Sequence, residues 1–207
     1  MNIRYELQQL LEKIVGDNKL HAKWLNTLSY LENCGARQIA ACEHPTEVKE
    51  EMLKHASEEF RHAHYLKSQI SKIENEVLAD YSLTNLLGGT ASLHYLKALN
   101  IKTSRYLYRE LRFSRDDVKK LAYLLVTYAI ELRAEELYFT YHEILRKSNS
   151  NIHVKSIILE EKEHLNEMKQ ALLEIPFGFM YAENVLQIEA YLYRKWIAGV
   201  QLQVCAK

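Results

Sequence analysis

Two segments far apart in the chain carry the same pair of metal-ligating side chains. Glu59 is followed three residues later by His62, and Glu161 is followed at the same spacing by His164. Residues three apart lie on one face of an α-helix, so each pair can bind one ion together. Carboxylate oxygens combined with imidazole nitrogens suit iron or manganese better than calcium or zinc. The spacing therefore predicts two halves of a transition-metal site, each carried by a helix.

One further glutamate precedes each pair on an otherwise apolar helical face. Glu32 shares its face with Leu28 and Ile39, and Glu131 lies on the face of Leu124. A carboxylate buried without a partner costs several kcal/mol, which a bound cation would offset. The two glutamates precede their Glu-x-x-His pairs by 27 and 30 residues. An antiparallel helical hairpin of either length brings its two acids to about the same height.

For three residues near the predicted ligands, the sequence leaves open whether they belong to the metal site. Glu135 lies one turn after Glu131 and offers a second inward carboxylate. We place Glu131 in the site because its flanks are more apolar, and keep Glu135 as an alternative or additional ligand. Tyr128, one turn before Glu131, could take part in redox chemistry, although tyrosine also packs well in helices for its own sake. His55, one turn before Glu59, is expected in the core or at its rim rather than as a ligand.

The combined pattern resembles the ferritin-like di-iron carboxylate superfamily, in which one helix supplies a Glu and the next a Glu-x-x-His, twice. The resemblance spans about residues 17–173 and rests on six positions. It implies an all-α, ferritin-like four-helix bundle with a long crossover between its second and third helices. It also implies two iron ions, or manganese with iron, whose charge balances the four carboxylates. The implied ligands are Glu32, Glu59, His62, Glu131, Glu161 and His164.

The residue before each motif glutamate has a role in the same resemblance. In oxygen-activating members this residue is often Asp, paired with a ligand histidine of the opposite hairpin. Glu58 and Glu160 occupy these positions here. We therefore expect Glu58 to contact His164 and Glu160 to contact His62, which would fix each imidazole's tautomer. Solvated side chains are the alternative for both glutamates, because Glu is one methylene longer than Asp.

The resemblance implies activation of dioxygen to oxidise a small or acyl-type organic substrate, with electrons from an external donor. Ferroxidase or peroxide-reductase activity, as in ferritins and rubrerythrins, is the alternative. The chain has no Cys-x-x-Cys pair, so the rubredoxin-like module of rubrerythrins is missing. Leu66 stands where the radical tyrosine of the similar ribonucleotide-reductase subunit would lie. A helical binding protein with solvated acids and no metal is the third hypothesis.

The composition excludes several other classes of protein. Lys and Arg together number 27, as do Asp and Glu, so no basic excess indicates nucleic-acid binding. Three cysteines without a close pairing indicate reduced thiols and a cytoplasmic protein. No apolar run reaches the roughly 18 residues of a membrane span. Only two Pro and six Gly, without β-type alternation, favour an all-α class.

We expect a single domain, 1–207, with an extra N-terminal and an extra C-terminal helix beside the bundle. The segment 74–113 is expected to be irregular, with short helical pieces at 93–96 and 106–111, and to cover one side of the bundle. The last helix carries an apolar stripe that must dock on the bundle or on a second subunit as a homodimer. The expected helices span about residues 3–15, 17–42, 49–73, 114–147, 152–174 and 182–204.

Overall fold

The computed structural model describes residues 3–44, 46–74 and 78–206, and throughout these ranges its regular elements are helices, with no strand. Short 3-10 turns cover Ile70–Lys72 and Leu83–Asn85, and a π-helical turn covers Tyr106–Glu110. The α-helices are α1 (Ile3–Val15), α2 (Asn18–Cys42), α3 (Glu50–Gln69), α4 (Thr90–Arg105), α5 (Arg115–Lys147), α6 (Lys155–Leu173) and α7 (Gly178–Cys205).

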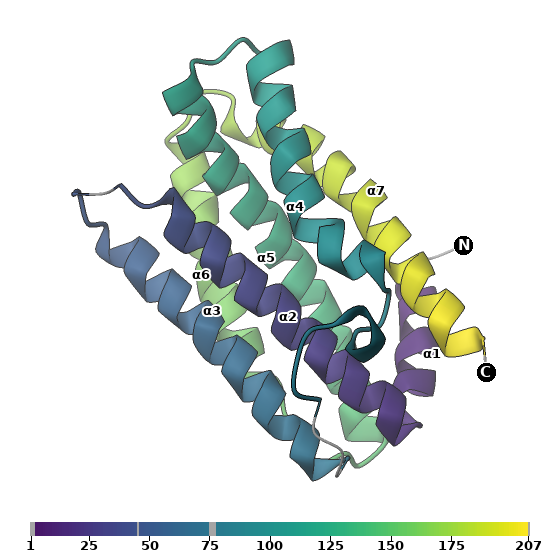
Figure 1. The fold of residues 1–207 in the computed structure, drawn as a ribbon. Helices are drawn as coiled ribbons and strands as arrows, with labels where there is room; N and C mark the ends of the chain where they lie inside the picture. Colours follow the sequence, from purple (N-terminus) through teal and green to yellow (C-terminus); the bar gives the residue numbers. More distant parts are fainter. Residues whose placement is uncertain (1–2, 45, 75–77, 207) are drawn as a thin grey trace.

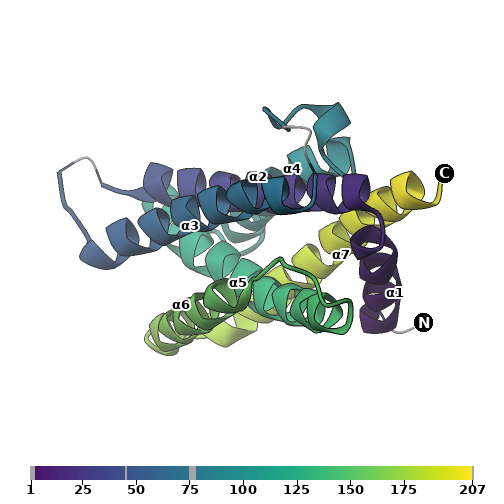
Figure 2. The same cartoon turned by 90° about the horizontal axis from the view of Figure 1, so that it is seen from below.

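Two helical hairpins face each other and form the centre of the molecule. Helices α2 and α3 make the first hairpin, and α5 and α6 make the second (Figure 1). Seen from below, the hairpins form two layers, and α7 runs obliquely beside α5 (Figure 2). The two chain ends lie on the same side, where α1 meets α7 (Figure 1). The space between the hairpins is where four helices can each contribute a side chain.

Side-chain caps fix the start of the first helix of each hairpin. The carboxylate of Asp17 accepts a hydrogen bond from the backbone N–H of Leu20 at 3.0 Å, which begins α2. The hydroxyl of Ser114 accepts one from the N–H of Asp117 at 3.2 Å, which begins α5. Each cap satisfies an N–H group that has no partner within the helix. The caps therefore set the register in which the inward-facing acids of α2 and α5 are presented.

The crossover between the hairpins is more regular than expected from the sequence. Instead of two short helical pieces, α4 runs without interruption from Thr90 and continues into the π-helical turn. Gly88 and Gly89 precede it with positive φ angles of 85° and 54°. A Cβ atom at Gly88 would lie 2.6 Å from the hydroxyl of Ser92. The two glycines therefore form a turn, and the segment after them is free to be helical.

The apolar stripe of the last helix docks within the chain. Helix α7 begins at Gly178, four residues earlier than expected, and packs against α4 and α5. Val185, Trp196 and Val200 are buried there, and the indole of Trp196 stacks on that of Trp24 with ring centroids 5.7 Å apart. Because these side chains are covered within one chain, the stripe gives no reason for a second subunit.

None of the helices in the described ranges combines the length and the apolar character that crossing a membrane requires.

Candidate metal centre

Four helices direct seven ligand-type side chains into the space between the hairpins. Helix α3 contributes three of them at spacings of four and three residues, which places all three on one face. Helix α6 contributes two, and α2 and α5 contribute one each. We call these residues the ligand cluster: Glu32, His55, Glu59, His62, Glu131, Glu161 and His164.

The ligand cluster divides into two groups that share one carboxylate. In the first group, ligand atoms of His55, Glu59, Glu131 and His164 all lie within 4.8 Å of one another. In the second, ligand atoms of Glu32, Glu59, His62 and Glu161 do the same. Glu59 belongs to both groups, so its two oxygens could bridge adjacent ions. The arrangement can therefore hold two metal ions side by side.

The two predicted contacts across the hairpins are both present. Nε2 of His62 on α3 lies 2.7 Å from Oε2 of Glu160 on α6. Nε2 of His164 on α6 lies 2.8 Å from Oε2 of Glu58 on α3. Arg61 also donates to both carboxylate oxygens of Glu160, at 3.1 and 2.7 Å. The alternative of solvated Glu58 and Glu160 is therefore wrong, because both are hydrogen-bonded to the opposite hairpin.

These contacts decide which imidazole nitrogen faces the cluster. A carboxylate only accepts hydrogen bonds, so in a neutral imidazole the Nε2 atom carries the proton and Nδ1 carries a lone pair. Nδ1 of His62 lies 3.2 Å from Oε1 of Glu161, and Nδ1 of His164 lies 3.4 Å from Oε1 of Glu59. Both histidines therefore aim a metal-binding atom at the carboxylates.

Several of these converging atoms have no hydrogen-bond partner. A buried polar atom without a partner costs free energy, and few remain in native proteins. A cation would stabilise such converging lone pairs, because it binds several of them at once. This is the observation of the structure that a bound metal would explain. The unpartnered atoms are Nδ1 of His62 and His164, Oε1 of Glu59 and Glu161, and Oε2 of Glu131.

Burial and mutual repulsion change the pKa values of the cluster. Burial raises the pKa of Glu131 to about 8. Burial and the neighbouring carboxylates raise the pKa of Glu32 and that of Glu161 well above the usual range. Burial opposes protonation of His62, but the contacts with Glu161 and Glu59 outweigh it and raise its pKa to about 12. Without a cation the cluster therefore retains protons, which bound metal ions would displace.

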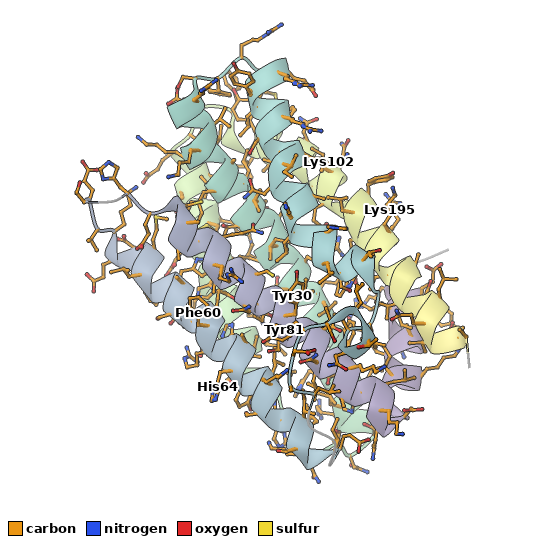
Figure 3. All side chains as sticks on the ribbon, in the orientation of Figure 1. Tyr30, Phe60, His64, Tyr81, Lys102 and Lys195 are labelled. Carbon is orange, nitrogen blue, oxygen red and sulfur yellow. The ribbon has the colours of Figure 1, made fainter. Side chains whose placement is uncertain are left out.

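His55 lies inside the ligand cluster, where the sequence interpretation favoured a core or rim position without a ligand role. Its ring is 2% exposed. Its Nε2 atom lies 2.9 Å from Oε1 of Glu131 and 3.3 Å from Oε1 of Glu59. The signal in the sequence is the spacing His-x-x-x-Glu-x-x-His, since residues four apart also share a helix face. In contrast, Phe60 and His64 lie on the exposed side of α3 (Figure 3).

The structure does not bring Glu135 or Tyr128 into the cluster. Glu135 is absent from both ligand groups, and the ring of Tyr128 makes an edge-on contact with Phe179 of α7. Tyr138 takes the place expected of Tyr128, and its hydroxyl donates a hydrogen bond to Glu32. Seven residues make almost two full helical turns, so Tyr138 shares the face of Glu131 more closely than a residue three positions away.

The acids of the cluster are buried, which contradicts the hypothesis of a binding protein with solvated acids. Glu59, Glu131 and Glu161 are 5%, 3% and 2% exposed. Their carboxylates, together with that of Glu32, form part of the wall of a largely apolar cavity that residues of α2, α4 and α5 also line. The candidate metal site therefore borders a largely apolar space.

Comparison of this chain with protein-family models, curated proteins and solved structures found no match. The assignment of a function therefore rests on the geometry of the ligand cluster.

Proposed function

We propose that this protein is a ferritin-like di-iron carboxylate oxidase or oxygenase that uses dioxygen to oxidise a small or acyl-type organic substrate. The single observation that supports this most is the convergence of carboxylate oxygens and imidazole nitrogens from four helices, several of which are buried and have no hydrogen-bond partner. Four carboxylates and a set of imidazoles suit two ferrous ions, or manganese with iron. Bound iron would supply the electrons that dioxygen must receive.

The residues around the site would control its geometry and its protons. Glu58 and Glu160 hold His164 and His62 in the tautomer that can bind metal. Tyr138 donates a hydrogen bond to Glu32, which orients that carboxylate and leaves its other oxygen for an ion. Apolar side chains from α2 and α5 keep bulk water away from the site.

The cavity favours oxidation of an organic substrate over ferroxidase activity. A ferroxidase must admit hydrated ferrous ions repeatedly, which polar or acidic access suits best. The cavity that leads to the ligand cluster is instead lined mainly by apolar residues, among them Leu28, Ile39, Val126 and Leu137. Such a cavity accepts an apolar substrate, and the substrate itself would complete the exclusion of water.

Oxygen uptake by the ferrous-loaded protein tests this function. We expect the wild type to consume dioxygen after anaerobic loading, and His62→Ala to lose most of this uptake. His64→Ala is the matched control, because His64 lies on the exposed side of the same helix. Uptake that continues in proportion to added ferrous ions, with ferric mineral as product, would indicate a ferroxidase instead. Equal uptake by both variants would reject the proposed site.

A further inference from the structure

The cavity beside the ligand cluster is long and narrow. Its lining extends from Leu28 to Cys42 on α2 and from Tyr123 to Tyr138 on α5. At 1.5 Å per helical residue, each wall is about 20 Å long. The cavity volume is only about 90 Å³, less than the roughly 150 Å³ cavity known to accept benzene in another protein. These proportions suit an unbranched chain better than a ring.

Gly35 marks empty space on the cavity wall. It lies in the middle of α2, where glycine costs about 1 kcal/mol relative to alanine. Apart from its two neighbours in the chain and the nearby backbone of its own helix, a Cβ atom built on Gly35 would meet no atom within 4 Å. Gly35 also lines the cavity, so the absence of a side chain contributes directly to the free space. No close backbone approach within the described residues requires a glycine at this position.

The cavity adjoins a surface groove between α2 and α4. The groove has a volume of about 420 Å³. Leu31, Gln38, Leu96 and Asn100 line both the groove and the cavity, so the two spaces adjoin. A ligand lying in both would pass from the surface to the carboxylates of the cluster.

Two cations and no carboxylate line the groove. Arg37 projects from α2 and Lys97 from α4, and both are exposed. Neither makes an ion pair with any of the residues that the structure describes. The other lining residues are apolar or uncharged, and they include Tyr30, whose position Figure 3 labels. The groove therefore complements an anionic group at the mouth of an apolar channel.

We propose that the groove and the cavity bind a single-chain anionic amphiphile, an unbranched alkyl chain with a carboxylate or phosphate head. Arg37 and Lys97 hold the head, and the chain passes Gln38 and Asn100 into the cavity toward the ligand cluster. This proposal rests on the proposed function in one respect: the amphiphile is a substrate only if the ligand cluster is an oxidising metal site. The binding itself requires no metal.

Calorimetric titration of the metal-free full chain tests the proposal. We expect dodecanoate to bind, and dodecanol and dodecyltrimethylammonium, which have the same chain length, to bind at least about tenfold more weakly. A parallel titration with dodecyl phosphate distinguishes the two anionic head groups. Equal affinity for the acid and the alcohol would overturn recognition of the head, and no binding of either anion would overturn the whole proposal.

Paired variants assign the binding to the two spaces. Arg37→Gln/Lys97→Gln should weaken dodecanoate binding about tenfold. Lys102→Gln/Lys195→Gln is the control with the same loss of charge, because neither lysine lines the groove and both lie toward α7 (Figure 3). Gly35→Leu should abolish binding by filling the cavity, whereas Gly35→Ala should retain most of it. Unchanged binding by Gly35→Leu would show that the chain does not enter the cavity.

Metal uptake by the same proteins separates this proposal from the proposed function. Gly35→Leu and the Arg37/Lys97 double variant should take up as much iron as the wild type. Binding of dodecanoate by a wild type that takes up no iron would reject the metal site and leave the amphiphile site standing. Uptake of iron without binding of either anion would reject the amphiphile site and leave the metal site standing.

Discussion

Helix α5 contributes to two polar clusters in the interior. They differ in whether the protein itself supplies partners for all their charged atoms. On one side, Arg133 donates from Nε and Nη2 to the two carboxylate oxygens of Glu189, at 2.9 and 2.8 Å. The hydroxyl of Tyr95 also donates to Glu189. On the other side, Glu131 enters the ligand cluster. We call the first set, Tyr95, Arg133 and Glu189, the arginine cluster.

The comparison shows that burial of charge does not by itself indicate a functional site. The arginine cluster contains one cation and one anion, and every oxygen of Glu189 has a donor. The ligand cluster contains four carboxylates and no Lys or Arg, and several of its inward-facing atoms have no partner. The first is complete within the protein, whereas cations from outside could complete the second. Loss of a carboxylate should therefore have opposite consequences in the two clusters.

The largest expected effect is loss of metal from the ligand cluster. Replacing Glu161 by Gln, or Glu59 by Ala, should reduce bound iron from about two per chain to one or none. The free energy of unfolding of the metal-free protein should change little for Glu161→Gln, because burial and the neighbouring carboxylates raise the pKa of Glu161 so far that glutamine replaces an already neutral group. Elemental analysis and chemical denaturation measure the two quantities. Glu163→Gln is the control on the exposed side of α6, and equal iron in Glu161→Gln and this control would refute the ligand role.

The arginine cluster should respond in the opposite way. Glu189→Gln removes the buried carboxylate that pairs with the partly buried guanidinium of Arg133 and leaves it only the more exposed Glu136. The free energy of unfolding should therefore fall, by at most about 3–5 kcal/mol. Iron content of the folded fraction should not change. Urea denaturation followed by circular dichroism measures the first effect. A variant that kept its stability but lost iron would remove the distinction between the clusters.

Contacts around the ligand cluster should have intermediate effects on affinity. Glu160→Gln replaces an acceptor of the His62 Nε2–H bond by an amide, and Glu58→Gln does the same for His164. Each change should weaken metal binding about 10- to 100-fold. Competition with a chelating dye measures the affinity. Wild-type affinity in both variants would mean that the two glutamates do not orient the histidines.

The smallest expected effect, when counted for one pH unit, is the change of affinity with pH. Burial raises the pKa of Glu131 to about 8, so below that pH the metal-free cluster holds a proton that a metal ion must displace. Metal affinity should therefore fall about tenfold for each pH unit below about 8. Titrations in buffers of different ionisation enthalpy would count the released protons. The arginine cluster takes no part, so affinity that did not depend on pH between about 6 and about 8 would contradict proton displacement.

The sequence was most informative where motif spacing, apolar periodicity and capping residues occur together in one helix. The Glu-x-x-His spacing alone places Glu59 and His62 on one face, and the acid before each motif led correctly to the contacts of Glu58 and Glu160. The α-helices of both hairpins were predicted to within a few residues, because apolar periodicity and capping residues agree there. These features depend on local spacing, which a single sequence records.

Features that depend on packing between distant segments were missed. Helix α4 buries Ser92 and Thr103 along with its apolar residues, so its inner face carries a weak apolar pattern. The pairing of Arg133 with Glu189 joins residues 56 positions apart and leaves no local signal. The contact of Tyr138 with Glu32 likewise joins two hairpins. Tertiary packing determines each of these contacts. For Tyr138, the seven-residue spacing from Glu131 is the one local signal that could have indicated its position.

Metal stoichiometry tests most directly whether the ligand cluster is completed from outside. The wild-type protein would be loaded anaerobically with ferrous ions, desalted, and measured for iron by elemental analysis. Four carboxylates and two groups of ligand atoms that share Glu59 predict about two irons per chain. Retention of no iron, or of no more than Glu59→Ala retains, would contradict a metal centre between the two hairpins.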